Sequence, residues 1–153
     1  MGIRMTTKLS EMHDMLIREA ERVERLTIRA LSKLGEQCVT KIRDRAGDKS
    51  WYDQTGNLRS SVGYVIAHNK NIIQYSTFNQ VKQGSEGVKT GKDLAKELAK
   101  RYSNNYVLIV VAGMNYAEFV EAMDNKDVLA STELWAREQV PLMLEKLKRQ
   151  VAK

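Results

Sequence analysis

The sequence is poor in the residues that cross-link a chain, break helices or bind metals. Its 153 residues include one cysteine, Cys38, one proline, Pro141, and two histidines, His13 and His68. A single cysteine excludes an intrachain disulfide and is typical of a reducing compartment. The two histidines lie far apart and lack further donors at ligand spacing, so the sequence predicts no metal site.

Long apolar runs are also missing. The longest run, 107–114, has the length of a strand and falls far short of the ~18 apolar residues that suggest a membrane span. The N-terminal residues alternate charged and apolar types, which argues against a signal peptide. With 42% hydrophobic residues the chain can still bury a core. We therefore predict a single domain, 1–153, that makes no membrane contact.

The patterns that usually carry catalysis are absent. No Gly-x-Ser-x-Gly segment occurs, and Cys38 falls on an apolar helix stripe, where it is more often a small core residue than a nucleophile. Glu86 and Asp93 stand where a phosphate-binding loop needs a glycine and a hydroxyl. Glu118 and Glu121 have the spacing of a solvated helix face. We predict no catalysis and no cofactor; a site gathering His68, Glu118 or Glu121 from distant segments would be the alternative.

The net charge of +6 is spread along the chain rather than concentrated. Basic residues exceed acidic ones by three in 1–50, by one in 51–125 and by two in 126–153. A nucleic-acid-binding protein usually gathers its charge on one surface. One basic edge is visible within 92–102, and it is either a contact for phosphate or membrane or a solvated face of mixed charge. Its residues are Lys92, Lys96, Lys100 and Arg101, with Asp93 and Glu97 between them.

The strongest helix signal covers residues 8–45. Apolar residues recur there at three- and four-residue steps, from Met12 through Leu16 and Val23 to Ile42. A straight helix of this length would span about 57 Å, whereas a compact domain of this size is about 40 Å across. The helix therefore either breaks near Gly35 or extends beyond the domain. An extending apolar stripe would need a partner.

The remaining elements predict an α+β fold. Residues 58–68 and 71–78 form a hairpin with its tip at 68–71 and a bulge or bend at Gly63. A polar loop at 79–91 precedes a short inserted helix, with Asp93 as an N-terminal acid. A buried strand follows, the most buried of the three, then a short helix and a C-terminal helix with a kink or new start at Pro141. We expect the long N-terminal and C-terminal helices to pack on one face of a small antiparallel sheet. The ranges are 92–102 for the inserted helix, 106–114 for the strand, 115–123 for the short helix and 128–152 for the C-terminal helix.

The segment between the first helix and the first strand is rich in turn residues. Trp51 and Tyr52 stand in it, and they either anchor a partner or fold back onto the sheet. Gly56 can supply the positive φ of a turn after Thr55. Leu58 is then expected to start the strand.

Two short stretches, 53–66 and 116–122, carry a resemblance to a known family. The first has the form Thr-Gly-x-Leu-x-x-Ser and enters a strand; the second has the form Tyr-Ala-x-x-Val-Glu and follows a strand. Together they resemble the tail-completion or head–tail joining (neck) proteins of long-tailed phages and prophages. The matching residues are Thr55, Gly56, Leu58, Arg59 and Ser61 in the first stretch, and Tyr116, Ala117, Val120 and Glu121 in the second.

This resemblance implies a virion structural protein that forms a homo-oligomeric ring with neck, connector or tail-tube proteins. It implies location in the virion, and in the host cytoplasm during assembly. The chain departs from the family pattern at 122–125, where the family has a Gly-containing turn, and at the inserted helix. The alternative function is a basic nucleic-acid-binding accessory protein, and incidental DNA contact is compatible with both.

Overall fold

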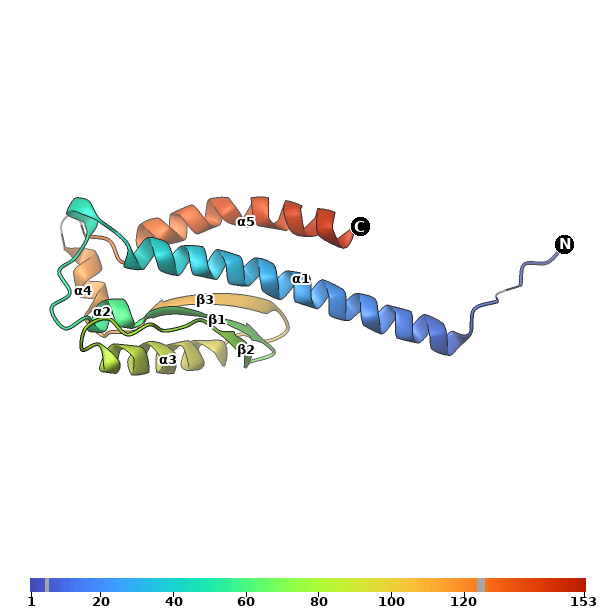
Figure 1. Cartoon of the computed structure of the whole chain (residues 1–153), viewed down its shortest axis with the longest axis horizontal. Helices are drawn as coiled ribbons and strands as arrows, with labels where there is room; N and C mark the ends of the chain where they lie inside the picture. The colour runs from blue at the N-terminus through green and yellow to red at the C-terminus, as the bar shows by residue number, and fades with distance from the viewer. Residues whose placement is uncertain (5, 124–125) are drawn as a thin grey trace.

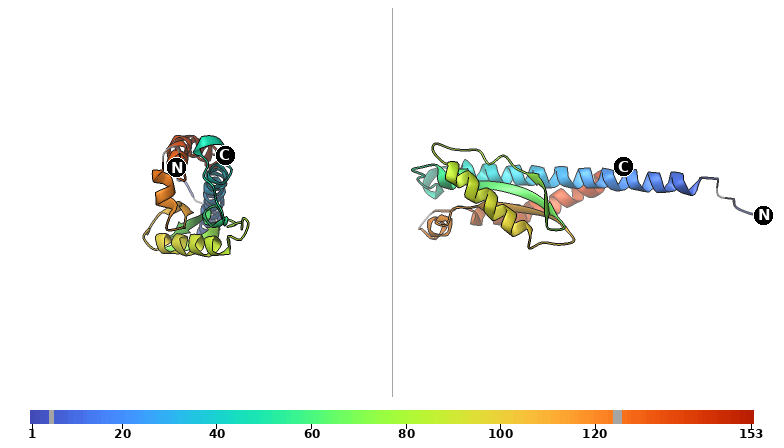
Figure 2. Two further views of the ribbon diagram at one scale, coloured as in Figure 1. Left: turned by 90° about the vertical axis from the view of Figure 1, so that its left-hand side faces the viewer. Right: turned by 90° about the horizontal axis from the view of Figure 1, so that it is seen from below.

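The longest element of the protein is a single straight helix, α1, which spans Leu9–Arg43. We describe it from a computed structural model that covers residues 1–4, 6–123 and 126–153. The N-terminal third of α1 projects beyond the rest of the folded domain, as Figures 1 and 2 show. The helix continues through Gly35 without a break. A side chain at this position would place its Cβ 2.7 Å from the ring of Tyr64. Glycine is present for close packing, and of the two predicted outcomes the overhang is the one observed.

Three antiparallel strands form the sheet, in the order β2-β1-β3. They are β1 (Val62–His68), β2 (Asn71–Tyr75) and β3 (Tyr106–Ala112). β1 and β2 make the predicted hairpin, whose two turn residues, Asn69 and Lys70, both have positive φ. The central strand β1 is the most buried, so the prediction that β3 would be is wrong. A central strand is covered by a neighbour on each side, and β3 is an edge.

Helices cover both faces of the sheet, which corrects the prediction of one covered face. Alternate residues of β1 point to opposite sides, and Tyr64 packs in the same cluster as Ile42 of α1. Val65 packs instead with Ala95 of α3, the helix that spans Ser85–Ala99. Figure 1 shows α1 and α3 on either side of the sheet. The α+β class itself is confirmed.

α3 is longer and starts earlier than predicted. Residues 85–91 of the expected 79–91 loop are helical, and the helix ends before the predicted limit of 92–102. Gly87 lies against the backbone carbonyl of Asn57 in α2 (Asn57–Ser60), and Gly91 lies against that of Ser61 just after this helix, so neither leaves room for a Cβ. Asp93 is consequently in the middle of α3 and not at its N-terminus. These two glycines lie in the segment that was predicted to be a loop, and their lack of a side chain is what lets α3 pack closely against α2 and the start of β1.

Gly63 is explained in a similar way. The ring of Phe78 occupies the space that a side chain at Gly63 would need. The irregularity in strand pairing lies elsewhere, between Ile66 and Ala67 on the β2 side. The predicted bulge at Gly63 is therefore wrong, and the glycine makes room for an aromatic ring.

The chain enters β1 through a helical turn rather than directly. α2 spans Asn57–Ser60, and Leu58 is buried within it, so the prediction that Leu58 starts the strand is wrong. A short 3-10 turn, η1 (Gly47–Lys49), precedes it. Both turns lie at the end of the molecule opposite to the α1 overhang (Figure 1).

The C-terminal helix α5, Ala130–Val151, packs mainly on α1 and not directly on the sheet. It runs through Pro141 as one helix that is gently bowed in Figure 1, so no new segment starts there. α4 (Ala117–Ala122) precedes it. The departure from the family pattern at 122–125 falls partly on residues 124–125, outside the described residues. In the described part of the chain, no helix is long and apolar enough to cross a membrane.

Candidate assembly site

The two family-like stretches meet at the α2–α4 end of the molecule. Thr55 and Tyr116 both line a polar hollow of about 490 Å³, together with Asp53 and Glu86. Burial raises the pKa of Tyr116, and the negative charge of Asp53 adds to this, while a hydrogen bond with Thr55 opposes it. The fold therefore brings the exposed Thr55 of the first stretch beside the partly buried Tyr116 of the second.

Most residues of the first stretch make internal contacts that stabilise this end of the fold. The buried carboxylate of Asp53 accepts hydrogen bonds from the backbone N–H groups of Gly56, at 3.0 Å, and Arg59, at 2.7 Å. Gly56 has a φ of 80°, and a Cβ there would lie 2.7 Å from the carbonyl carbon of Val81. Both features require glycine. Asp53 was not among the residues singled out from the sequence, although its position just before Thr55-Gly56 is typical of a turn.

Arg59 links this turn to the end of α1. Its guanidinium donates to the backbone oxygens of Trp51, at 3.2 Å, and Arg43, at 3.3 Å, and to the Ser50 hydroxyl at 2.9 Å. It also lies 4.7 Å above the Trp51 ring. Trp51 is buried whereas Tyr52 is 86% exposed. Of the two aromatic residues, Trp51 folds back and only Tyr52 is free to meet a partner.

The second stretch also has an internal role. Glu121 accepts hydrogen bonds from three consecutive backbone N–H groups at the start of α5, those of Val128 at 3.1 Å, Leu129 at 2.7 Å and Ala130 at 3.1 Å. A carboxylate at this position satisfies N–H groups that the helix leaves unpaired and faces the positive end of its dipole. Ala117 lies partly buried in the first turn of α4. Glu121 thus holds α4 to α5.

A buried ion pair fixes the same junction. Arg45 lies 2.6 Å from Asp127, with both side chains about 90% covered, and also donates to the hydroxyls of Ser131 and Thr132. Burial by itself would raise the pKa of Asp127. The hydrogen bonds from Ser131 and the charge of Arg45 outweigh it, so the pKa lies below its ordinary value. Neither residue was anticipated, because partners 82 positions apart leave no local pattern.

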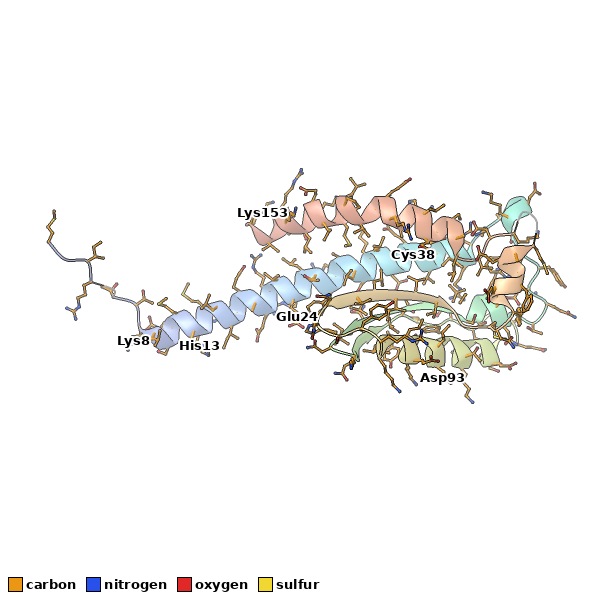
Figure 3. The ribbon with its side chains drawn as sticks, turned by 180° about the vertical axis from the view of Figure 1, so that it is seen from behind. Lys8, His13, Glu24, Cys38, Asp93 and Lys153 are labelled. Carbon is orange, nitrogen blue, oxygen red and sulfur yellow. The ribbon has the colours of Figure 1, made fainter. Side chains whose placement is uncertain are left out.

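The residues tested for chemistry remain scattered. His13 lies on the overhang, far from the buried Cys38 (Figure 3), while His68 stacks on Tyr106 at 4.1 Å. Burial raises the pKa of the Cys38 thiol. Glu118 is exposed on α4. Within the described ranges, no three His, Cys, Asp or Glu side chains are grouped so as to hold a metal ion. That the protein is not an enzyme stays a prediction.

One exposed apolar surface lies on the α1 overhang. Arg22 marks its boundary, because its guanidinium donates to the backbone oxygens of Gln150 and Val151 at the end of α5. N-terminal to Arg22, α1 leaves the cover of α5, and Leu9 and Leu16 are 77% and 68% exposed. The sequence indicated this surface through the length of the helix. The further exposed apolar residues here are Met12, Met15 and Ile17.

A second apolar surface is an open groove of about 600 Å³ between α1, β3 and α5. Leu108 and Val110 of the edge strand form one wall, and Val140, Met143 and Leu144 of α5 form the other. Glu133 and Arg137, paired at 2.6 Å, stand among the few polar side chains beside it. No sequence pattern predicts this groove, because its walls come from three separate elements.

Comparison of the chain with models of known protein families, with curated proteins and with solved structures finds no match.

Proposed function

We propose that this protein is a non-catalytic structural subunit of a phage or prophage virion, placed at the head–tail junction or the tail end as a tail-completion or neck ring subunit. The observation that carries the proposal is the α1 overhang, an apolar helix that extends beyond its own domain. The resemblance of 53–66 and 116–122 to the family supports the same assignment.

The overhang favours assembly on energetic grounds. Isolated helices of this length are marginal in water, and this one leaves large apolar side chains in solvent. Burying one leucine or methionine side chain contributes about 1.5–3 kcal/mol. Several such side chains on a single stripe therefore supply enough free energy to join two subunits. A monomeric protein gains nothing from this exposed stripe.

The two ends of the molecule suit different tasks. The Asp53, Arg59 and Glu121 contacts make the α2–α4 end rigid, and they leave Thr55, Tyr52 and Tyr116 accessible around a polar hollow. We assign that end to contact with a neighbouring virion protein. The overhang at the opposite end is assigned to contact within the ring.

Light scattering of the purified full chain, alone and with its neck partners, tests the assembly. We expect oligomers, and we expect Leu9→Gln with Leu16→Gln to weaken them by about tenfold or more. Ile73→Gln, at an exposed apolar site on β2, is the matched control and is expected to change little. A chain that stays monomeric in every mixture refutes the assembly role.

Location is tested separately. Antibody labelling of purified particles of the encoding phage is expected to mark the head–tail junction or the tail end. Particles that contain none of the protein would contradict the virion assignment.

A second candidate function, nucleic-acid binding, is favoured by one surface. Residues 82–101 hold six basic and three acidic side chains, a net charge of +3, which is half the charge of the chain. Helical spacing places three lysines of α3 and the lysine that follows it in a single row, opposite the small residues that pack on the sheet. The row consists of Lys89, Lys92, Lys96 and Lys100, and all four are exposed.

Duplex DNA binding distinguishes this candidate. If the lysine row contacts phosphates, a variant that loses three of these lysines should bind DNA with a weaker dependence on salt. The slope of log affinity against log salt concentration should fall in magnitude by about 0.9 per lost contact in the triple variant Lys89→Gln, Lys92→Gln and Lys100→Gln. Lys146→Gln with Lys148→Gln on α5 is the control. Binding that is absent, or insensitive to the α3 changes, removes the candidate.

A further inference from the structure

The apolar stripe of α1 continues beyond the point where α5 stops covering it. From Arg22 onward α5 lies antiparallel against α1, and before Arg22 the same face carries Leu9, Met12 and Leu16 into solvent. Helical geometry places these three residues on one side of the helix, since they are separated by three and four positions. The overhang, from Leu9 to Glu21, therefore presents an exposed apolar helix face about 20 Å long.

The groove between β3 and α5 offers an apolar surface of matching kind. Val140 and Leu144 in its α5 wall are 36% and 44% exposed. α5 has 22 residues and is about 33 Å long, which is enough to accommodate the overhang beside it. The opposite wall is the edge strand β3, and among the residues that the structure describes it pairs with β1 alone.

The overhang cannot enter the groove of its own chain. α1 is one continuous helix that runs straight from the groove floor at Leu34 to the overhang tip at Leu9, so the overhang points away from the groove. Figure 2 shows the overhang directed away from the domain in a perpendicular view. A matching pair of apolar surfaces that one copy cannot bring together can be joined between two copies.

The charges of the two elements are complementary. Residues 9–21 hold four acidic side chains and one basic one, a net charge of −3, whereas residues 142–153 hold one acidic and four basic ones, a net charge of +3. Opposite fields of this kind steer encounter and disfavour overhang–overhang pairing, in which like charges would meet. They favour contact between the overhang of one copy and the last turns of α5 in another, which continue from the groove beyond its last lining residue, Leu144.

We propose that the overhang of one subunit docks in the β3–α5 groove of a second copy of the same chain. This inference rests on the proposed ring function and deepens it. Because the two surfaces differ, the contact is heterologous, so each subunit offers one overhang and one open groove to its neighbours. Repetition of such a contact closes into a ring when the rotation allows it, and otherwise continues as a filament.

Disulfide trapping between two singly labelled proteins tests the contact. In a Cys38→Ala background, one protein carries Leu16→Cys on the overhang and the other carries Leu144→Cys in the groove; both positions are exposed, so folding is preserved. After mixing and oxidation we expect about tenfold more linked mixed dimer than with Arg18→Cys in place of Leu16→Cys. Arg18 lies on the opposite face of α1, outside the short distance that a disulfide spans.

The outcomes separate this inference from the function on which it rests. Mixed dimers specific to Leu16→Cys support it. Linkage of Leu16→Cys chains mainly to one another would show overhang–overhang pairing and overturn it. Light-scattering oligomers without the specific link would also overturn it while leaving the ring function intact. Assembly only with a different virion protein overturns it as well, and a monomer under all conditions rejects both proposals.

Discussion

Replacement of Gly35 by alanine sets two opposing effects against each other. In an exposed helix interior, Gly→Ala stabilises by about 1 kcal/mol because alanine loses less conformational entropy. Here the new Cβ would lie 2.7 Å from the ring of Tyr64, a residue that is 1% exposed in the central strand. Overpacking of a core costs about 1–3 kcal/mol. We therefore expect Gly35→Ala to lower the free energy of unfolding by about 1–2 kcal/mol.

Urea denaturation followed by circular dichroism measures this change, and a double-mutant cycle identifies its cause. In a Tyr64→Leu background the ring is gone, so Gly35→Ala is expected to become neutral or stabilising. A wild-type background in which Gly35→Ala raises the denaturation midpoint would refute the packing argument. So would the same destabilisation in both backgrounds.

Three further predictions concern the α2–α4 end. Gly56→Ala is expected to destabilise by more than about 2 kcal/mol in thermal unfolding, because it adds a clash to the left-handed φ of 80°; Gly47→Ala, with a φ of 72° and free space, is expected to cost only about 1–2 kcal/mol. Glu121→Gln weakens the charged cap of α5 and is expected to cost about 0.5–2 kcal/mol by urea titration, whereas equal effects from the exposed Glu118→Gln would contradict the cap. The pKa of Asp127 is depressed by folding, so its stabilisation is present above the unfolded pKa of about 3.9 and is lost as pH falls through the folded pKa. Asp127→Asn should remove that part of the acid dependence of the denaturation midpoint, and an unchanged profile would contradict it.

The elements that follow a regular period could be predicted from sequence. The stripe of α1 and the Asn69-Lys70 turn of the hairpin are local signals, and both are found where expected. Failures occurred where a distant contact decides the conformation. Gly87 and Gly91 indicated a loop by composition, but a sheet-facing helix needs small residues at close approach, and no local pattern distinguishes the two cases.

The candidate site divides in the same way. Comparing helix length with domain size left two outcomes, a break near Gly35 or an overhang, and the structure shows the overhang. The internal partners of Arg59 and Glu121 could not be predicted from the sequence. The groups that these two side chains bind are brought to them by chain reversals between α1 and β1 and between α4 and α5. The sequence therefore shows the motif residues as a pattern, whereas the structure shows that Arg59 and Glu121 hold neighbouring segments together by hydrogen bonds.

The hydrogen bonds from Arg22 to the end of α5 also mark a boundary in α1 between a more stable C-terminal part and a less stable N-terminal part. C-terminal to Arg22, helix amides open only when packed structure opens with them, whereas N-terminal to it they depend on a short, uncovered helix that frays at little cost. Hydrogen exchange in the free subunit should change steeply along one continuous helix. A partner that captures the overhang would then order it as well as bind it, so part of the association free energy is spent on folding the overhang.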